Sequence, residues 1–217
     1  MTHARDLPAI ASVAQPGEGD KLVAPAAERN QGPITDLLRH VAPATGAALE
    51  LASGTGQHVV AFAAALPGLT WQPSEVDARR RASIAAYVAE AGLPNLRPPV
   101  EIDVTTPGWG KAHSADLIVL INLLHLITVA ETRALLGEVA QALRSGGRFV
   151  VYGPFKRADE LTSDGDRAFH ASLIAADPLI GYKDDFDTMD WIQETGLEIA
   201  EVIEMPANNL AIVARAW

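Results

Sequence analysis

The sequence contains no cysteine. Disulfide bonds, thiolate nucleophiles and cysteine-ligated zinc are therefore excluded. It also has no continuous apolar stretch near its start, because charged residues and prolines interrupt the scattered apolar positions of residues 1–20. Such a segment predicts neither a signal peptide nor a membrane-spanning helix, and we expect a cytoplasmic protein without a membrane partner.

Positive charge is scarce, with 17 lysines and arginines against 27 aspartates and glutamates in 217 residues. The net charge of -10 opposes a phosphate backbone, so nucleic acid is not an expected partner. The local run Arg79 to Arg81 is typical of a solvated helix face. A hydrophobic content of 48% predicts a packed core, and the length suits one domain.

Apolar runs alternate with helical patterns along most of the chain. The expected strands are residues 47–52, 69–72, 100–104, 115–121, 148–152, 199–205 and 210–214. The expected helices begin at Pro33, Gln57, Ser74, Thr128 and Asp187. Residues 1–24 are expected to form a partly flexible arm, and residues 25–217 a single domain.

Strands separated by helices predict parallel neighbours, whereas the short break at residues 206–209 suits an antiparallel hairpin. The predicted fold class is therefore α/β. We expect a Rossmann-like, mostly parallel seven-stranded sheet with helices on both faces and a C-terminal antiparallel hairpin. This is the architecture of class I methyltransferases, and until a site supports it the likeness is one of fold alone.

A glycine bend, Ser53-Gly54-Thr55-Gly56, follows the first of these strands. Glu50 precedes Gly54 by four residues, and a carboxylate there suits a ligand with an ammonium group and repels a pyrophosphate. Val59 stands where a dinucleotide-binding pattern has its third glycine. The bend therefore favours S-adenosylmethionine over NAD as the cofactor. The alternative is a structural turn with a solvated Glu50.

Acidic residues follow the next two expected strands. Glu75 is placed to accept both hydroxyl hydrogens of a ribose, with Asp77 as a competitor that looks more like a helix cap. Asp103 is placed to accept from an adenine amino group, and Val104 to offer a backbone N–H to a ring nitrogen. These positions predict the nucleoside half of the cofactor site.

Asn122 and His125 follow the fourth expected strand, the region that lies beside a transferred methyl group in this fold. Asn122 is expected to bind the methionine portion or orient the acceptor, and His125 to act as a base. The apolar neighbours of His125 equally suit a core histidine. Tyr152 comes from the end of the fifth strand and is the second catalytic candidate. The histidines show no metal-ligand spacing, so metal-independent transfer is expected.

Two further segments are expected near the site. Glu28, Arg29 and Asn30 lie ahead of the first expected helix, either as a lid in which Arg29 or Asn30 meets the cofactor or as a capping segment. Residues 159–187, with Phe169 and Tyr182, are expected to form an insertion covering the substrate.

Several longer segments resemble a family of methyltransferase-like proteins catalogued as domain of unknown function 938. They are residues 25–30, 50–58, 71–75, 152–156 and 204–210, and the resemblance spans nearly everything after Lys21. It implies the class I methyltransferase fold and S-adenosylmethionine bound at Glu50, Gly54, Gly56 and Glu75. It implies no substrate. Glu75 departs from the aspartate expected in the family, although a longer carboxylate still reaches a ribose.

The sequence thus predicts an S-adenosylmethionine-dependent methyltransferase acting on an oxygen, nitrogen or sulfur atom of a small-molecule acceptor. A non-catalytic binder of the same nucleoside and, further away, an NAD-dependent oxidoreductase are the alternatives. A homodimer is left open.

Overall fold

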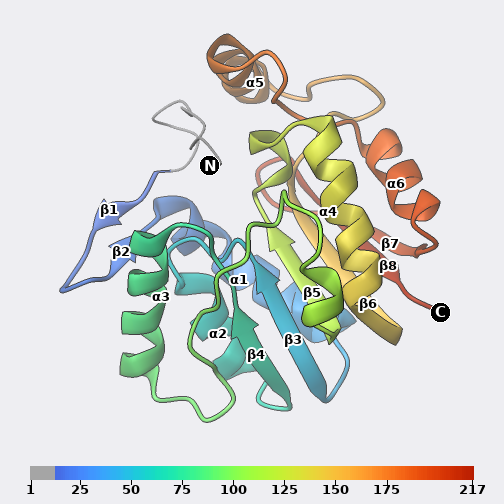
Figure 1. Cartoon of the computed structure of the whole chain (residues 1–217). Helices are drawn as coiled ribbons and strands as arrows, with labels where there is room; N and C mark the ends of the chain where they lie inside the picture. Colours follow the sequence, from blue (N-terminus) through green and yellow to red (C-terminus); the bar gives the residue numbers. More distant parts are fainter. Residues whose placement is uncertain (1–12) are drawn as a thin grey trace.

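The computed structural model describes residues 13–217, and its centre is a six-stranded sheet in the order β4-β3-β5-β6-β8-β7 (Figure 1). The strands are β3 (Gly46–Leu51), β4 (Leu69–Pro73), β5 (Ala115–Ile121), β6 (Leu143–Pro154), β7 (Glu198–Glu204) and β8 (Asn209–Arg215). The first four run parallel, whereas β8 pairs antiparallel with both β6 and β7. The predicted Rossmann-like class and its closing hairpin are confirmed.

The predicted strand at residues 100–104 is wrong, and the sheet has six strands rather than seven. Instead of a ladder, the chain forms two isolated bridges along this edge of the sheet, Leu96 with Trp71 of β4 and Val100 with Ser74 just beyond β4. Pro98 and Pro99 lie between the two bridges and have no N–H groups, so a continuous ladder cannot form there.

The two faces of the sheet are covered by different helices. The helices are α1 (Pro25–Val41), α2 (Gln57–Ala65), α3 (Ala78–Ala91), α4 (Val129–Ala142), α5 (Asp164–Ala176) and α6 (Asp185–Glu194). Leu117 and Val119 of β5 belong to the core that contains α1 and α2, whereas Ile118 and Leu120 belong to the core that contains α4 and α6. This alternation follows from the two-residue period of a strand and explains why the strand is apolar throughout.

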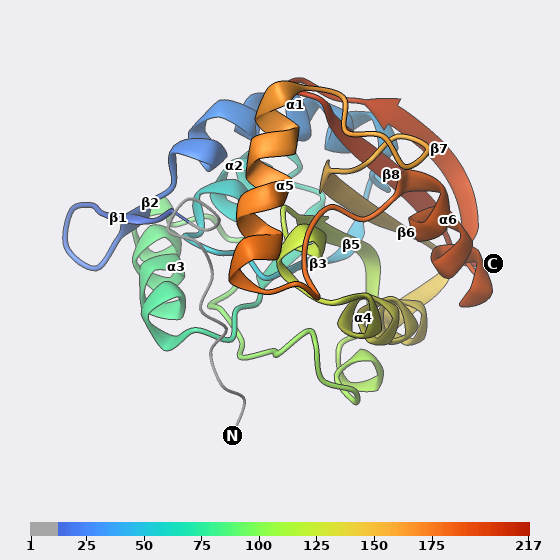
Figure 2. The same ribbon diagram turned by 90° about the horizontal axis from the view of Figure 1, so that it is seen from above.

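Helix α5 lies apart from these layers, beyond the carboxyl ends of the parallel strands (Figures 1 and 2). Of its residues only Leu173 is buried. The helix begins after Ser163, whose hydroxyl accepts a hydrogen bond from the Asp166 N–H at 3.1 Å. The sequence predicted an insertion here but not a helix.

Helix α6 begins at Asp185, two residues before the predicted Asp187, and two other helices begin further from their predicted starts. Helix α1 begins at Pro25, eight residues before Pro33, which lies inside it. Pro25 occupies the first turn, where the missing N–H costs nothing, and it is the true start signal. Helix α3 begins at Ala78 rather than Ser74, because Asp77 caps it by accepting from the Arg80 N–H at 2.8 Å.

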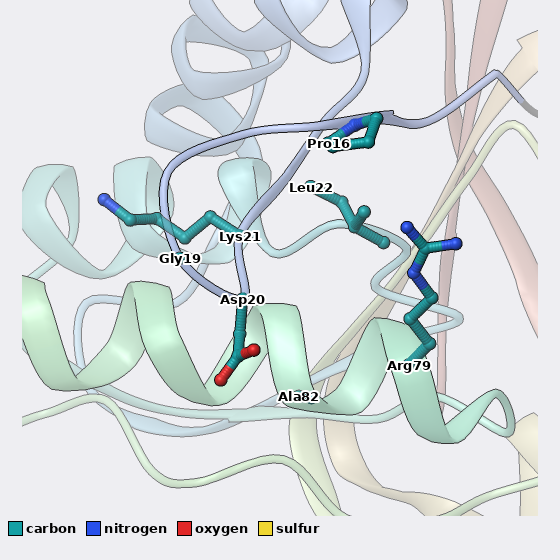
Figure 3. Close-up of a pocket in the computed structure, with 7 residues that line it drawn as sticks. All are labelled: Pro16, Gly19, Asp20, Lys21, Leu22, Arg79 and Ala82. Carbon is teal, nitrogen blue, oxygen red and sulfur yellow. The ribbon is translucent and has the colours of Figure 1, made fainter.

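The described part of the predicted arm is held against α3. Strands β1 (Gln15–Pro16) and β2 (Leu22–Val23) form a small hairpin, and Figure 3 shows its tip beside α3 around a hollow of about 170 Å³. The Leu22 N–H donates to the Ser83 hydroxyl, and the Tyr87 hydroxyl donates to the Leu22 carbonyl. The remainder of the predicted arm, residues 1–12, lies outside the described residues. Across 13–217, no helix combines the length and apolarity needed to cross a bilayer.

Candidate functional site

A cavity of about 1290 Å³ lies at the carboxyl ends of the parallel strands. Open α/β sheets bind ligands at this edge, where connections diverge to opposite faces. The volume exceeds the range of roughly 300–1,000 Å³ that is usual for one drug-sized ligand. The cavity therefore has room for two small molecules side by side. All predicted site residues except Gly56 line it, namely Arg29, Asn30, Glu50, Ser53, Gly54, Glu75, Asp103, Val104, Asn122, His125 and Tyr152.

The glycine bend connects β3 to α2 along one wall. Gly54 and Gly56 have φ angles of 60° and 95°, in the left-handed region that favours glycine. A Cβ on Gly56 would lie 2.9 Å from the Ile84 Cα of α3, so only glycine allows this close packing. The Ser53 N–H donates to the Ser74 carbonyl at 2.8 Å and fixes the bend to the end of β4. Gly56 thus shapes the bend by packing against α3, although it does not line the cavity itself.

The Glu50 side chain is 1% exposed, and its Oε2 atom has no hydrogen-bond partner among the described residues. Burial and, to a lesser extent, the charge of Glu75 raise the pKa of this carboxyl to about 8, although a hydrogen bond with Ser53 opposes the rise. A buried carboxylate without a partner is costly. A ligand cation at the cavity edge would supply the missing partner, so the arrangement fits an ammonium group.

Glu75 stands beyond the end of β4 and is also buried. Its carboxylate accepts from the N–H groups of Gly54, Val76 and Asp77 at 3.0, 2.9 and 3.2 Å. These bonds fix the carboxylate at the cavity wall and use three of its roughly four acceptor sites, so one site, on Oε2, is left for a ligand. Asp77 is committed to capping α3, as the sequence indicated.

Asp103 and Val104 line the cavity on the segment that follows the isolated bridge at Val100. Asp103 Oδ1 accepts from the Thr105 N–H at 3.0 Å and the Thr105 hydroxyl at 2.6 Å, which fixes the turn. Within residues 13–217 the Val104 N–H makes no hydrogen bond, so it can donate to a ligand.

Asn122 ends β5 with a φ of 55°, a left-handed conformation that asparagine tolerates better than most residues. Its N–H donates to the Tyr152 carbonyl at 2.8 Å. The backbone therefore turns sharply after β5, beside its neighbour β6, and Asn122 lines the cavity there.

His125 lies in the short 3-10 helix η2 (Leu124–Leu126) and is 4% exposed. Its ring centroid lies 5.6 Å from that of Phe169 on α5 and 6.1 Å from that of Tyr182, both edge to face. Burial, together with the charge of Lys183, lowers the pKa of His125 to about 3. The ring is both a core residue and part of the cavity wall, so the two sequence interpretations are compatible.

The structure places Arg29 and Asn30 inside α1 rather than in a segment ahead of a helix, because α1 begins earlier than predicted. Both line the cavity, and Asn30 Oδ1 lies 2.7 Å from His58 Nε2 on α2. Tyr152 on β6 is 2% exposed, and burial raises its phenol pKa while a hydrogen bond with Asn30 opposes the rise. Sequence reasoning missed His58, although it stands directly after the glycine bend.

No metal cluster accompanies these residues: across residues 13–217, no three histidine, aspartate or glutamate side chains are grouped to hold an ion.

Solved structures with a similar fold include proteins named as O-methyltransferases. An O-methyltransferase family protein from Burkholderia thailandensis aligns with a TM-score of 0.77 at 16% identity, covering 88% of this chain and 57% of that chain. PigF with SAH aligns at 0.71 and 20% identity, covering 87% and 56%. An O-methyltransferase family 2 protein from Planctomyces limnophilus DSM 3776, in complex with apigenin, aligns at 0.73 and 17% identity, covering 88% and 60%.

These likenesses define the class: the chain has the Rossmann-like methyltransferase fold, and it spans little more than half the length of these proteins. The family model described as "Protein of unknown function (DUF938)" matches residues 21–216. The chain belongs to this family, and the resemblance seen in its sequence motifs is confirmed.

Proposed function

We propose that the protein transfers the methyl group of S-adenosylmethionine to an oxygen, nitrogen or sulfur atom of a small-molecule acceptor. The observation that carries this proposal is the buried, unpartnered Oε2 of Glu50 beside the glycine bend. A cationic amino-acid tail would pair with it, whereas a pyrophosphate would be repelled. PigF with SAH, a protein of the same fold, supports the choice of nucleoside.

Each part of the cofactor has candidate partners along the cavity. Glu50 would hold the ammonium group, Arg29 the carboxylate, and the backbone from Ser53 to Gly54 the chain between them. Glu75 would accept from a ribose hydroxyl through the acceptor site that its backbone partners leave on Oε2. Asp103 and Val104 would bind the adenine edge, and Asn122 would lie beside the methionine portion. When bound, S-adenosylmethionine supplies a methyl group already activated by its sulfonium, so no covalent enzyme intermediate and no metal ion are needed.

The acceptor would occupy the part of the cavity below α5, where His125, Phe169 and Tyr182 form an aromatic wall. At neutral pH His125 is uncharged, so its imidazole would accept a hydrogen bond from an acceptor hydroxyl or amine and orient its lone pair toward the methyl group. Because a pKa of about 3 makes His125 a weak base, the proton would pass to solvent as the methyl group is transferred. Tyr152 also lines the cavity, and burial, which raises its phenol pKa, keeps its hydroxyl protonated, so it would donate a hydrogen bond to a ligand. The neighbour in complex with apigenin supports a small aromatic acceptor.

The test is turnover with methyl-labelled S-adenosylmethionine against a panel of phenols, thiols and aromatic amines, following formation of S-adenosylhomocysteine. We expect one class of acceptor to be methylated, with H125F at least tenfold slower than the wild type and E50Q impaired in cofactor binding. Nucleoside binding with no transfer to any member of the panel would favour the non-catalytic binder. Greater thermal stabilisation by NAD than by S-adenosylmethionine would favour an oxidoreductase.

A further inference from the structure

The cavity wall below α5 carries a carboxylate. Asp166 lies in the first turn of α5, three residues before Phe169, and both side chains line the cavity. The Asp166 Oδ1 atom accepts a hydrogen bond from the Tyr182 hydroxyl at 3.1 Å. The Tyr182 ring in turn lies edge to face with the rings of Phe169 and His125. The carboxylate therefore stands beside the aromatic wall.

Asp166 is held in place by neutral groups. Its Oδ2 atom accepts from the hydroxyls of Ser163 and Thr162 at 2.6 and 3.1 Å, and from the Asn208 side-chain amide at 3.2 Å. Burial acts to raise the pKa of Asp166, but these hydrogen bonds, together with that from Tyr182, outweigh it and lower the pKa, so the side chain is ionised at neutral pH. Among residues 13–217 the Oδ1 atom accepts only from Tyr182, so it keeps an acceptor site for a ligand.

The positively charged side chains near the cavity are placed elsewhere. Arg80 belongs to the cofactor end, because its Nη1 atom lies 3.8 Å from the position of a Cβ on Gly54. Arg29 on α1 is the candidate partner of the cofactor carboxylate. Lys183 is buried, donates to two backbone carbonyls and does not line the cavity. In the described part of the chain no lysine, arginine or histidine forms an ion pair with Asp166, so its charge is available to a cationic ligand.

A carboxylate beside an aromatic wall suits a molecule that is both aromatic and cationic. The rings would pack against a ligand ring, and ring faces also attract a cation. The carboxylate would attract the same cation directly. A carboxylate or phosphate on the ligand would instead face a like charge, and rejection of the wrong partner by like charges is a common source of specificity.

We propose that Asp166 determines the class of acceptor: it selects an aromatic molecule with a cationic group, such as a protonated amine, and rejects one with a carboxylate or phosphate. The proposal rests on the proposed function for the role of this end of the cavity. A protonated amine has no free lone pair, so it is the group that is recognised, and a second nucleophile on the same molecule receives the methyl group. With a phenol, the oxygen–methyl bond forms as the sulfur–methyl bond breaks, the electron pair of that bond goes to sulfur, and the phenol proton passes to solvent.

Three phenols that differ in the charge of their para substituent test the selection. At pH 7 tyramine is cationic, p-ethylphenol is neutral and p-hydroxyphenylacetate is anionic. With methyl-labelled S-adenosylmethionine, we expect the kcat/KM of the wild type to be roughly tenfold higher for tyramine than for p-ethylphenol, and lower again for p-hydroxyphenylacetate.

Two substitutions in the first turn of α5 separate charge from structure. D166N keeps the size of the side chain but removes its charge, so the order of the three phenols should be lost. D164N is the matched control, because Asp164 is exposed and does not line the cavity, and it should keep the wild-type order. Equal values in the wild type would overturn the proposal. So would a D166N variant that weakens all three phenols alike, since that is the result expected of a residue that only holds α5 in place.

A second measurement needs no methyl transfer. The same three compounds are titrated by calorimetry into the wild type and both variants, with S-adenosylhomocysteine present. Tighter binding of tyramine that D166N abolishes, without methylation of any compound, would support the selection and contradict the proposed function. If the wild type binds none of the three compounds, or binds them equally, the proposal fails. The order of the wild-type affinities tests it even where D166N does not fold.

Discussion

The buried Glu50 carboxyl makes the stability of the ligand-free protein depend on pH, and E50Q should remove that dependence. Its pKa is about 8 in the folded chain, against 4.5 for an unperturbed glutamate. The folded state therefore holds this proton more tightly than the unfolded state does. The stabilisation is complete below pH 4.5 and is lost as the pH rises through 8.

The size of the effect follows from the two pKa values. Integrating the difference in bound protons from pH 5 to pH 9 gives a loss of about 4 kcal/mol, at 1.36 kcal/mol for each pKa unit. For a chain of 217 residues this corresponds to roughly 8–16 °C in the unfolding temperature. The E50Q variant loses this contribution, because an amide does not titrate in this range.

The assay is urea unfolding of the wild type and E50Q at pH 5, 7 and 9 without ligand. Other groups titrate in both proteins, so the difference between them isolates Glu50. From pH 5 to pH 9 we expect the free energy of unfolding of the wild type to fall by about 4 kcal/mol relative to that of E50Q. The same substitution at the exposed Glu160 should produce no such change. A difference between wild type and E50Q that stays constant from pH 5 to pH 9 would refute the reasoning.

Three further predictions concern single residues. In NMR titrations the imidazole resonances of His125, assigned with H125F, should stay constant from pH 5 to pH 8 because the pKa of this residue is about 3. A titration midpoint near 6.5 would contradict its burial beside Lys183. G56A should lower the free energy of unfolding in urea by about 3 kcal/mol, because Gly56 has a left-handed φ angle and its Cβ would lie 2.9 Å from Ile84. G92A, which has a left-handed φ angle but open space around it, should lower it by about 1 kcal/mol. Equal losses would show that the close packing at Gly56 is unimportant. D77A should lower the free energy of unfolding by about 1 kcal/mol, and D77N should lower it much less, because asparagine also caps helices. An unchanged stability of D77A would show that the cap of α3 contributes nothing.

Most of the fold could be predicted from the sequence because its strongest signals are local. Ala115–Ile121 is apolar without interruption, as a strand covered on both faces must be, and the short break before β8 required a hairpin. The glycine bend could be predicted because two glycines in four residues directly follow an apolar strand. Glu50 could be found because its carboxylate stands beside that bend, four residues before Gly54.

The features that could not be predicted depend on context beyond the local pattern. The predicted start of α1 was wrong because both Pro25 and Pro33 suit the first turn of a helix, and only packing decides between them. Helix α5 buries a single residue and so has no apolar stripe, although Ser163 and Asp166 have the spacing of a capping box. The pairing of His58 with Asn30 joins two helices through tertiary packing, and no spacing in the sequence indicates it.

The most direct test of the central claim, that Glu50 holds the ammonium group of the nucleoside, is calorimetric titration with S-adenosylhomocysteine at pH 7 in two buffers of different ionisation enthalpy. With a pKa of about 8 the free carboxyl is mostly protonated at pH 7, and it must ionise to pair with the ligand, so binding should release about 0.9 proton from the wild type. Binding without proton release, or no binding at all, would contradict the account.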